Sequence, residues 1–159
     1  MTSILEILQW FEYSSVLVAM RSSPWLFPVI ATFHLFGLVL LGSAIVTVDL
    51  RLLGLGLTRH SAAELARGTD PLLLGGLAVL FISGVPLLLC FGTKYYYLPA
   101  FWVKLLALSL AIAFAATVHR RVINSDIVGR GDFPARSVGL VSLALWSCVM
   151  LCGRLIGFP

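Results

Sequence analysis

The chain has 159 residues, of which 60% are hydrophobic and only 11% are charged, and its mean hydropathy is +1.03. Soluble domains carry about 25% charged residues, so this composition excludes an ordinary soluble domain, a disordered chain and a disulfide scaffold. The length is that of a single domain. The formal net charge is +4, but the sequence has no basic helix and no basic–aromatic stripe, so we expect no nucleic-acid binding. Lys and Arg instead flank the apolar stretches, as in membrane proteins.

Four stretches of the chain are long, apolar and nearly free of charge. Stretches of 27, 23 and 17 uncharged residues follow Arg21, Asp70 and Arg136, and a fourth stretch that starts at Tyr95 is interrupted only by Lys104. A helix needs roughly 20 apolar residues to cross a bilayer, and backbone exposed to lipid must be helical because no water is there to satisfy it. The sequence therefore predicts four membrane-spanning helices, at about 24–48, 71–92, 98–119 and 136–157.

Prolines and capping residues predict where the second of these helices begins and bends. We expect Asp70 to cap this span and Pro71 to occupy its first turn. Pro86 lies inside the span, where it removes a backbone hydrogen bond and is expected to kink the helix. In the preceding loop, Ser61 and Glu64 form a capping-box pattern, which predicts a separate short surface helix.

The first twenty residues are predicted to form an amphipathic helix and not a signal peptide. They have no Lys or Arg ahead of the apolar residues, and Glu6, Gln9 and Glu12 interrupt the apolar run. Ser3 and Glu6 form a further capping-box pattern. We expect this helix, at about 2–20, either to lie in the membrane interface or to pack against the end of the bundle.

The distribution of Lys and Arg predicts the orientation in the membrane. The two longer loops hold seven of these residues and the opposite side holds four. This asymmetry favours a cytoplasmic position for the loops and places both termini outside.

His34 is the first candidate for a ligand-binding residue. It lies about ten residues into the first span, and ionisable groups within spans usually face the bundle interior. At a similar depth the other spans offer Ser83, Ser109, Ser147 and Cys148. We expect these residues to form a polar layer. There the imidazole can bind a metal, ligate haem iron or hydrogen-bond a quinone carbonyl, or it can hydrogen-bond a neighbouring serine and simply join two helices.

His119 is a second candidate for binding a cofactor, but it lies at a different depth. It is about twenty residues into the third span, which runs in the same direction as the first, so the two histidines differ in depth by roughly 15 Å. One haem held between His34 and His119 is therefore disfavoured. At the inner boundary we expect structural pairing of Asp49 with His119 or Arg120, with Arg51 nearby on the same helix.

The remaining reactive groups lie in the spans toward the outer end. Cys90 ends the second span, and Cys148 and Cys152 are one turn apart in the fourth. No two cysteines have zinc-type spacing. They can be small buried hydrophobes, a soft-metal site formed with His34, or, for Cys90 and Cys152, a disulfide. Lys104 either extends to the interface or forms a cationic mouth for an anionic group or a quinone head.

Several segments resemble a family of small four-helix bacterial inner-membrane proteins of unknown function. They are residues 25–37 (WLFPVIATFHLFG), 48–54 (VDLRLLG) and 153–156 (GRLI), together with Lys104 and His119. The resemblance covers almost the whole chain and implies a four-helix fold in the bacterial inner membrane. A looser similarity to cytochrome b561-type and copper-resistance D bundles implies a histidine-bound cofactor. Cytochromes b561 carry two histidine pairs, whereas this chain has three histidines, so two bis-histidine haems cannot form.

These features predict an all-α integral membrane four-helix bundle with an N-terminal interfacial amphipathic helix, formed as one domain by residues 1–159. The function we expect is that of a haem b-binding electron-transfer subunit that uses His34. The alternatives are a non-catalytic membrane subunit that binds a partner protein or lipid, and a copper-handling protein. We expect no catalytic set of residues. The expected partners are membrane lipid, a quinone or redox protein, and further copies of the chain.

Overall fold

The computed structural model describes residues 4–55, 59–124 and 133–157. Within these ranges the chain forms helices joined by turns and contains no strand, which confirms the predicted all-α fold. Four helices are long and apolar enough to cross a membrane, as the uncharged stretches predict. They are α3 (Leu26–Leu52), α4 (Ala62–Cys90), α6 (Pro99–Phe114) with its continuation to Ile123, and α8 (Phe133–Ile156).

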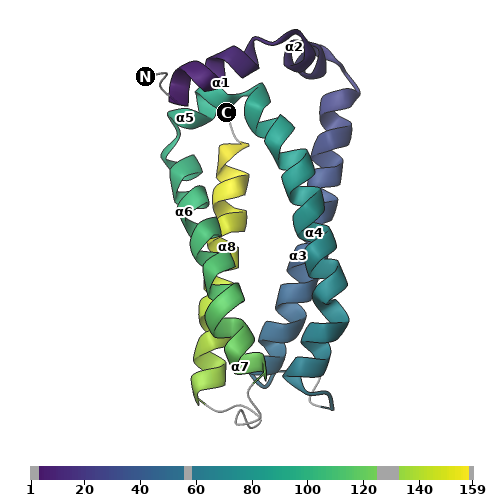
Figure 1. Cartoon of the computed structure of the whole chain (residues 1–159), viewed down its shortest axis with the longest axis vertical. Coiled ribbons are helices and arrows are strands. Elements are labelled where there is room, and N and C mark those ends of the chain that lie inside the picture. The colour runs from purple at the N-terminus through teal and green to yellow at the C-terminus, as the bar shows by residue number, and fades with distance from the viewer. Residues whose placement is uncertain (1–3, 56–58, 125–132, 158–159) are drawn as a thin grey trace.

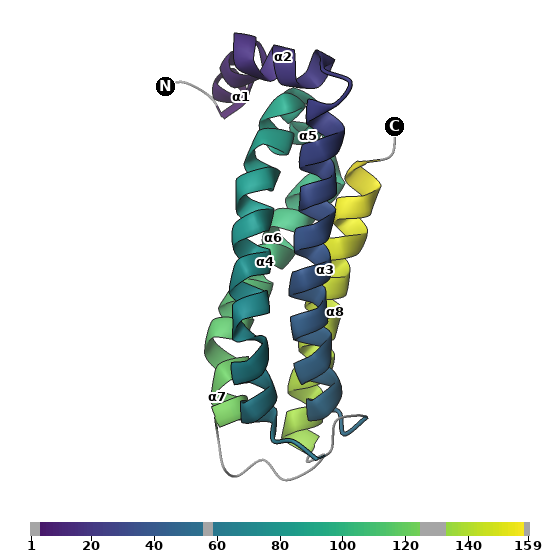
Figure 2. The same ribbon diagram turned by 90° about the vertical axis from the view of Figure 1, so that its right-hand side faces the viewer.

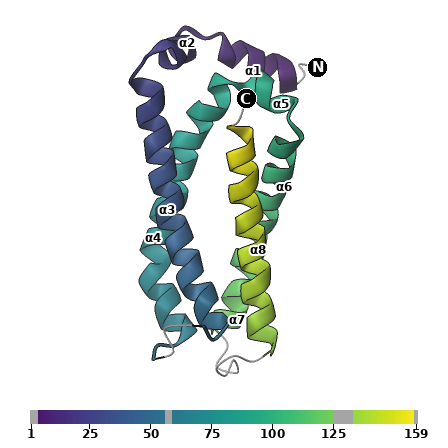
Figure 3. The same ribbon diagram turned by 180° about the vertical axis from the view of Figure 1, so that it is seen from behind.

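The long helices are arranged as two hairpins. Helix α3 packs along α4, α6 packs along α8, and the contact of α3 with α8 joins the two pairs (Figure 1). The views from opposite sides show that the hairpins lie closest together at the end where α7 (Arg120–Asn124) lies, and further apart toward the other end (Figure 3). We call the end at α7 the inner end and the opposite end the outer end.

Two glycines allow α3 and α4 to approach closely. A Cβ atom added to Gly76 would lie 2.7 Å from the backbone nitrogen of Leu41, and one added to Gly37 would lie 3.2 Å from the Gly76 carbonyl oxygen. Helices in lipid are held by van der Waals packing and polar contacts, because lipid tails are as apolar as the side chains. Small residues at this crossing therefore bring the two backbones into direct contact.

The outward faces of the four helices are covered by large apolar side chains. Among the most exposed are Phe36, Val39, Ile82, Leu106 and Leu151, one or more from each long helix. In water such surface would be unfavourable over so large an area. Acyl chains are a suitable environment for it, which agrees with the length and hydropathy of the helices.

Helix α4 begins earlier than we predicted. It runs without a break from Ala62 to Cys90, so the short surface helix and the second span are one element, and Pro71 lies inside it. The start is fixed by Ser61, whose side chain accepts from the Glu64 backbone N–H while the Glu64 carboxylate accepts from the Ser61 N–H. Pro71 removes one hydrogen bond near the loop end of the helix, which is not enough to end it.

Two further departures concern helix ends. Helix α6 continues into η1 (Ala115–His119), a π-helical turn, before α7 begins. Helix α3 ends at Leu52, and Gly54 follows with a φ of 77°, the left-handed conformation that favours glycine. The N–H of Gly54 bonds to the Arg51 carbonyl and the N–H of Leu55 bonds to the Leu50 carbonyl, which together form a Schellman cap.

The predicted N-terminal helix is two helices. Helix α1 (Ile4–Glu12) and helix α2 (Ser15–Ser22) lie across the outer end of the bundle (Figure 2). Helix α1 packs on α5 (Gly92–Tyr96), a short helix that the sequence did not predict, and a Cβ atom on Gly92 would lie 3.0 Å from Leu8 Cδ2. The amphipathic segment thus packs against the end of the bundle. The Ser3–Glu6 capping box lies outside the described residues.

The glycine contact predicts a sharp difference between two adjacent positions. Gly76→Ala is expected to lower the free energy of unfolding by about 1–3 kcal/mol relative to Gly75→Ala. The added methyl at Gly76 meets the backbone of α3, whereas nothing lies within 4 Å of a Cβ at Gly75. Both substitutions gain the same helix propensity, so the difference reports packing. Reversible unfolding of the detergent-solubilised protein measures it. Equal stability of the two variants would contradict the close approach of α3 and α4.

Candidate functional site

His34 is held by a hydrogen-bond chain between α3 and α4. Its Nδ1 lies 2.9 Å from Ser83 Oγ, and the Ser83 hydroxyl donates to the Val79 carbonyl at 2.5 Å. Ser83 is buried, with 4% of its surface exposed. Because the hydroxyl has only one hydrogen, and this goes to Val79, the network assigns a hydrogen to Nδ1 of His34 and leaves a lone pair on Nε2.

The surroundings of this ring come from three helices. On α4, a Cβ added to Gly84 would lie 3.1 Å from His34 Cε1, so the ring rests on the glycine. On α6, Lys104 is near enough for its charge to act on the imidazole. Lys104 also lies against α8, where a Cβ on Gly153 would be 3.5 Å from its Nζ, and it acts electrostatically on Cys152.

The predicted polar layer is only partly present. His34 and Ser83 are in contact, but Ser109 and Ser147 lie on the exposed faces of their helices, and the Ser109 hydroxyl bonds back to its own helix at Leu105. Counting residues gives depth, but each residue turns a helix by about 100°, so equal depth does not ensure a common face. The prediction also missed Ser142, which is buried on α8.

The cysteines do not form the predicted metal site. Cys90 is fully buried and its thiol points to the Leu17 carbonyl, 3.9 Å away, beneath α2. Cys148 and Cys152 lie on α8, and all three cysteines are free, so the predicted Cys90–Cys152 disulfide is absent. Across the described residues, no three His, Cys, Asp or Glu side chains come together to hold a metal ion.

At the inner end, the side chains of Asp49 and His119 are paired. Asp49 Oδ1 lies 2.7 Å from His119 Nε2, and 0% of the Asp49 side chain and 13% of the His119 side chain are exposed. Arg120, the other predicted partner of Asp49, is exposed. Arg51 is buried and donates from Nε to the carbonyl of His60 at 2.7 Å, so it fastens the loop that precedes α4.

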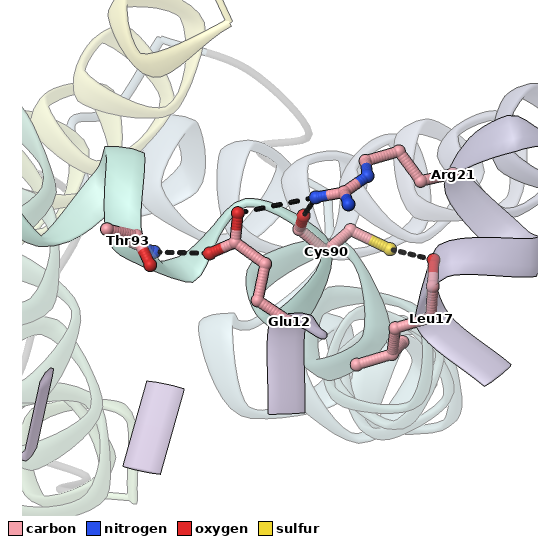
Figure 4. Close-up of polar contacts among 5 residues, drawn as sticks. All are labelled: Glu12, Leu17, Arg21, Cys90 and Thr93. Carbon is pink, nitrogen blue, oxygen red and sulfur yellow. Dashed lines mark hydrogen bonds and ion pairs between the residues drawn. The ribbon is translucent and has the colours of Figure 1, made fainter. Parts of the chain in front are cut away.

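The outer end is closed by an ion pair that the sequence analysis missed. Arg21 Nη1 lies 3.3 Å from Glu12 Oε1 and donates to the Cys90 carbonyl at 3.0 Å, while Glu12 Oε2 accepts from the Thr93 backbone N–H at 2.9 Å (Figure 4). Arg21 therefore caps the carbonyl end of α4 and Glu12 caps the amide end of α5. We call these four residues the outer clamp. Its pattern in the sequence is two opposite charges on either side of a helix break, which is too common to be diagnostic.

The comparison with known families gives one match. The model of a family of unknown function (DUF6644) covers residues 8–159. The chain belongs to this family. The DUF6644 match includes the outer clamp, His34 with Ser83, and Asp49 with His119, and it confirms the predicted resemblance to a four-helix family of unknown function. No curated protein and no solved structure matches the chain.

The outer clamp predicts a local effect of its removal. In Glu12→Gln, amide hydrogen exchange in α1 and α2 is expected to become roughly tenfold faster, since charge-assisted hydrogen bonds contribute about 1.5–3 kcal/mol each. Exchange in the four long helices is expected to stay unchanged. Gln9→Ala, an exposed position on the same helix, is the control. Unaltered exchange of α1 and α2 in Glu12→Gln would contradict the proposed anchoring of these helices.

Proposed function

We propose that this protein is a multi-pass protein of the bacterial inner membrane that binds haem b through Nε2 of His34 and serves as an electron-transfer subunit. The observation that carries this proposal is the hydrogen-bond chain from His34 Nδ1 through Ser83 to the Val79 carbonyl. Histidines that ligate metals generally donate their other ring N–H to a carboxylate, a backbone carbonyl or water, which fixes the tautomer and the ring orientation. Here the acceptor is the Ser83 hydroxyl.

Two residues beside His34 bear on haem binding. Gly84 has no side chain, so the imidazole packs directly against α4 next to its bond to Ser83, and Lys104 supplies a positive charge suited to a propionate group. A haem b bound there would carry one electron at a time within the membrane. The chain's own contribution is to hold the imidazole in one orientation and to place a cation beside it.

The proposal involves one haem for each chain, with one histidine from that chain. His119 is occupied with Asp49 at the inner end and His60 lies in the exposed loop beyond α3. Among the histidines of this chain, a haem at this site would therefore be held by His34 alone. With the longer loops in the cytoplasm, the haem would lie in the outer half of the bilayer, where a quinone or a redox protein can reach it.

A second function is favoured by a different observation. The outer clamp fixes α1 and α2, and these helices and the start of α3 expose large side chains: Trp10, Tyr13, Val16 and Trp25. Aromatic side chains concentrate at membrane interfaces. A non-catalytic membrane subunit that binds lipid or a partner protein through these helices is the alternative.

Absorption spectra of the purified full-length protein test the haem proposal. After expression with sufficient haem, the protein is expected to show a Soret band that changes on reduction. His34→Ala should abolish the band. Ser83→Ala breaks the same interhelical hydrogen bond but keeps the ligand, so it should retain the band with roughly 10–100-fold weaker haem affinity. His60→Ala, in the loop, should have no effect.

Two results would overturn the proposal. One is a colourless wild-type protein that is folded by circular dichroism, which would favour the second function. The other is a Soret band that persists unchanged in His34→Ala.

A further inference from the structure

Asp49 is a fully buried carboxyl group with one oxygen unaccounted for. Its Oδ1 is bonded to His119 Nε2, whereas Oδ2 has no hydrogen-bond partner among the described residues. Leaving a buried carboxylate oxygen unpaired is unfavourable, because the group has lost its hydration without replacement. Intramembrane ionisable groups of this kind usually have a functional role.

The environment of the pair is apolar. Val48 and Leu52 on α3, Ile123 on α7 and Ala135 on α8 form a buried cluster at this end. The Asp49 carbonyl is covered by α8, since a Cβ on Gly139 would lie 3.1 Å from it. In such surroundings, gaining or losing one charge changes the energy of the pair more than it would in water.

Other charged groups lie on every helix around the pair, but they do not neutralise it. In the part of the chain that the structure describes, none of them forms an ion pair with Asp49 or His119. Arg51 is turned to the His60 carbonyl, and most of the others are exposed. They are Arg51 on α3, Glu64, Arg67 and Asp70 on α4, Arg120 and Arg121 on α7, and Arg136 on α8.

Access to the pair is one-sided. The Asp49 side chain has no exposed surface, whereas 13% of the His119 side chain is exposed. His119 is also the last residue of the π-helical turn, and such turns occur frequently at functional sites. Of the two groups, only the imidazole has surface through which a proton can enter the pair.

We propose that Asp49 and His119 form a proton-binding site that exchanges with water at the inner end of the bundle. A hydronium ion gives its proton to Nδ1 of the neutral imidazole and becomes water. The imidazolium then passes the proton on Nε2 to Asp49 Oδ1, which leaves a neutral imidazole and a neutral carboxylic acid. The charge of the buried pair rises by one in the first step and is redistributed in the second. This site is independent of haem binding at His34.

Nitrogen-15 NMR of the histidine rings in the full-length, micelle-solubilised protein tests this proposal. The His119 ring is expected to gain and lose a proton reversibly while the protein stays folded. Asp49→Asn is expected to change the proton affinity of this ring roughly tenfold or more. The exposed pair of His60 and Glu64, which are four residues apart in the chain and 3.9 Å apart in space, is the matched control, and Glu64→Gln should change the proton affinity of His60 less than about threefold.

A second measurement does not depend on folding of Asp49→Asn. The infrared C=O band of the protonated Asp49 carboxyl is expected to shift in His119→Gln and to stay in place in His60→Gln. The proposal is wrong if the His119 ring never changes protonation in the folded protein. It is also wrong if Asp49→Asn leaves the proton affinity of that ring unchanged, or if the carboxyl band moves in neither histidine variant.

Discussion

The hydrogen bond between Asp49 and His119 connects the α3–α4 hairpin to the α6–α8 hairpin at the end where the two lie closest. Lipid provides no hydrophobic force to press helices together, so small residues and polar contacts must hold the hairpins. Gly139 lets α8 approach the backbone carbonyl of Asp49, whose carboxyl group is fully buried. The polar contact and the close approach together join the hairpins at the inner end of the bundle.

The outer end is built differently. There the hairpins lie further apart, and α1 and α2 lie across them, anchored by Glu12 and Arg21 to the ends of α4 and α5. His34 belongs to this half of the molecule, on the α3–α4 hairpin, and the charge of Lys104 on α6 acts on it. The bundle is therefore tightly joined at one end and capped at the other, and the two histidines within the spans, His34 and His119, each have a partner of their own.

The sequence predicted the four long helices well, because uncharged stretches of this length have few alternatives to crossing lipid. Helix ends were harder. Pro71 suggested a start, but a proline near the loop end costs only one hydrogen bond, and the capping box at Ser61 prevailed. The π-helical turn before α7 and the division of the N-terminal segment into two helices depend on tertiary packing, for which the local sequence holds no clear signal.

The candidate sites, like the helices, were predicted only in part. Counting residues along each span correctly placed His34 at the same depth as Ser83, and it also predicted the contact of Asp49 with His119. It failed for Ser109 and Ser147, since depth along a helix says nothing about which face a residue occupies. That face is decided by packing against the neighbouring helices, and the sequence alone did not reveal this packing.

A double-mutant cycle on Asp49 and His119 tests most directly whether this contact holds the hairpins together. The free energy of unfolding in mixed micelles would be measured for the wild type, Asp49→Asn, His119→Gln and the double variant. Breaking a buried pair from one side costs about 3–5 kcal/mol of stability. We therefore predict that the sum of the stability losses in the two single variants exceeds the loss in the double variant by about 1 kcal/mol or more. Losses that simply add would contradict the account.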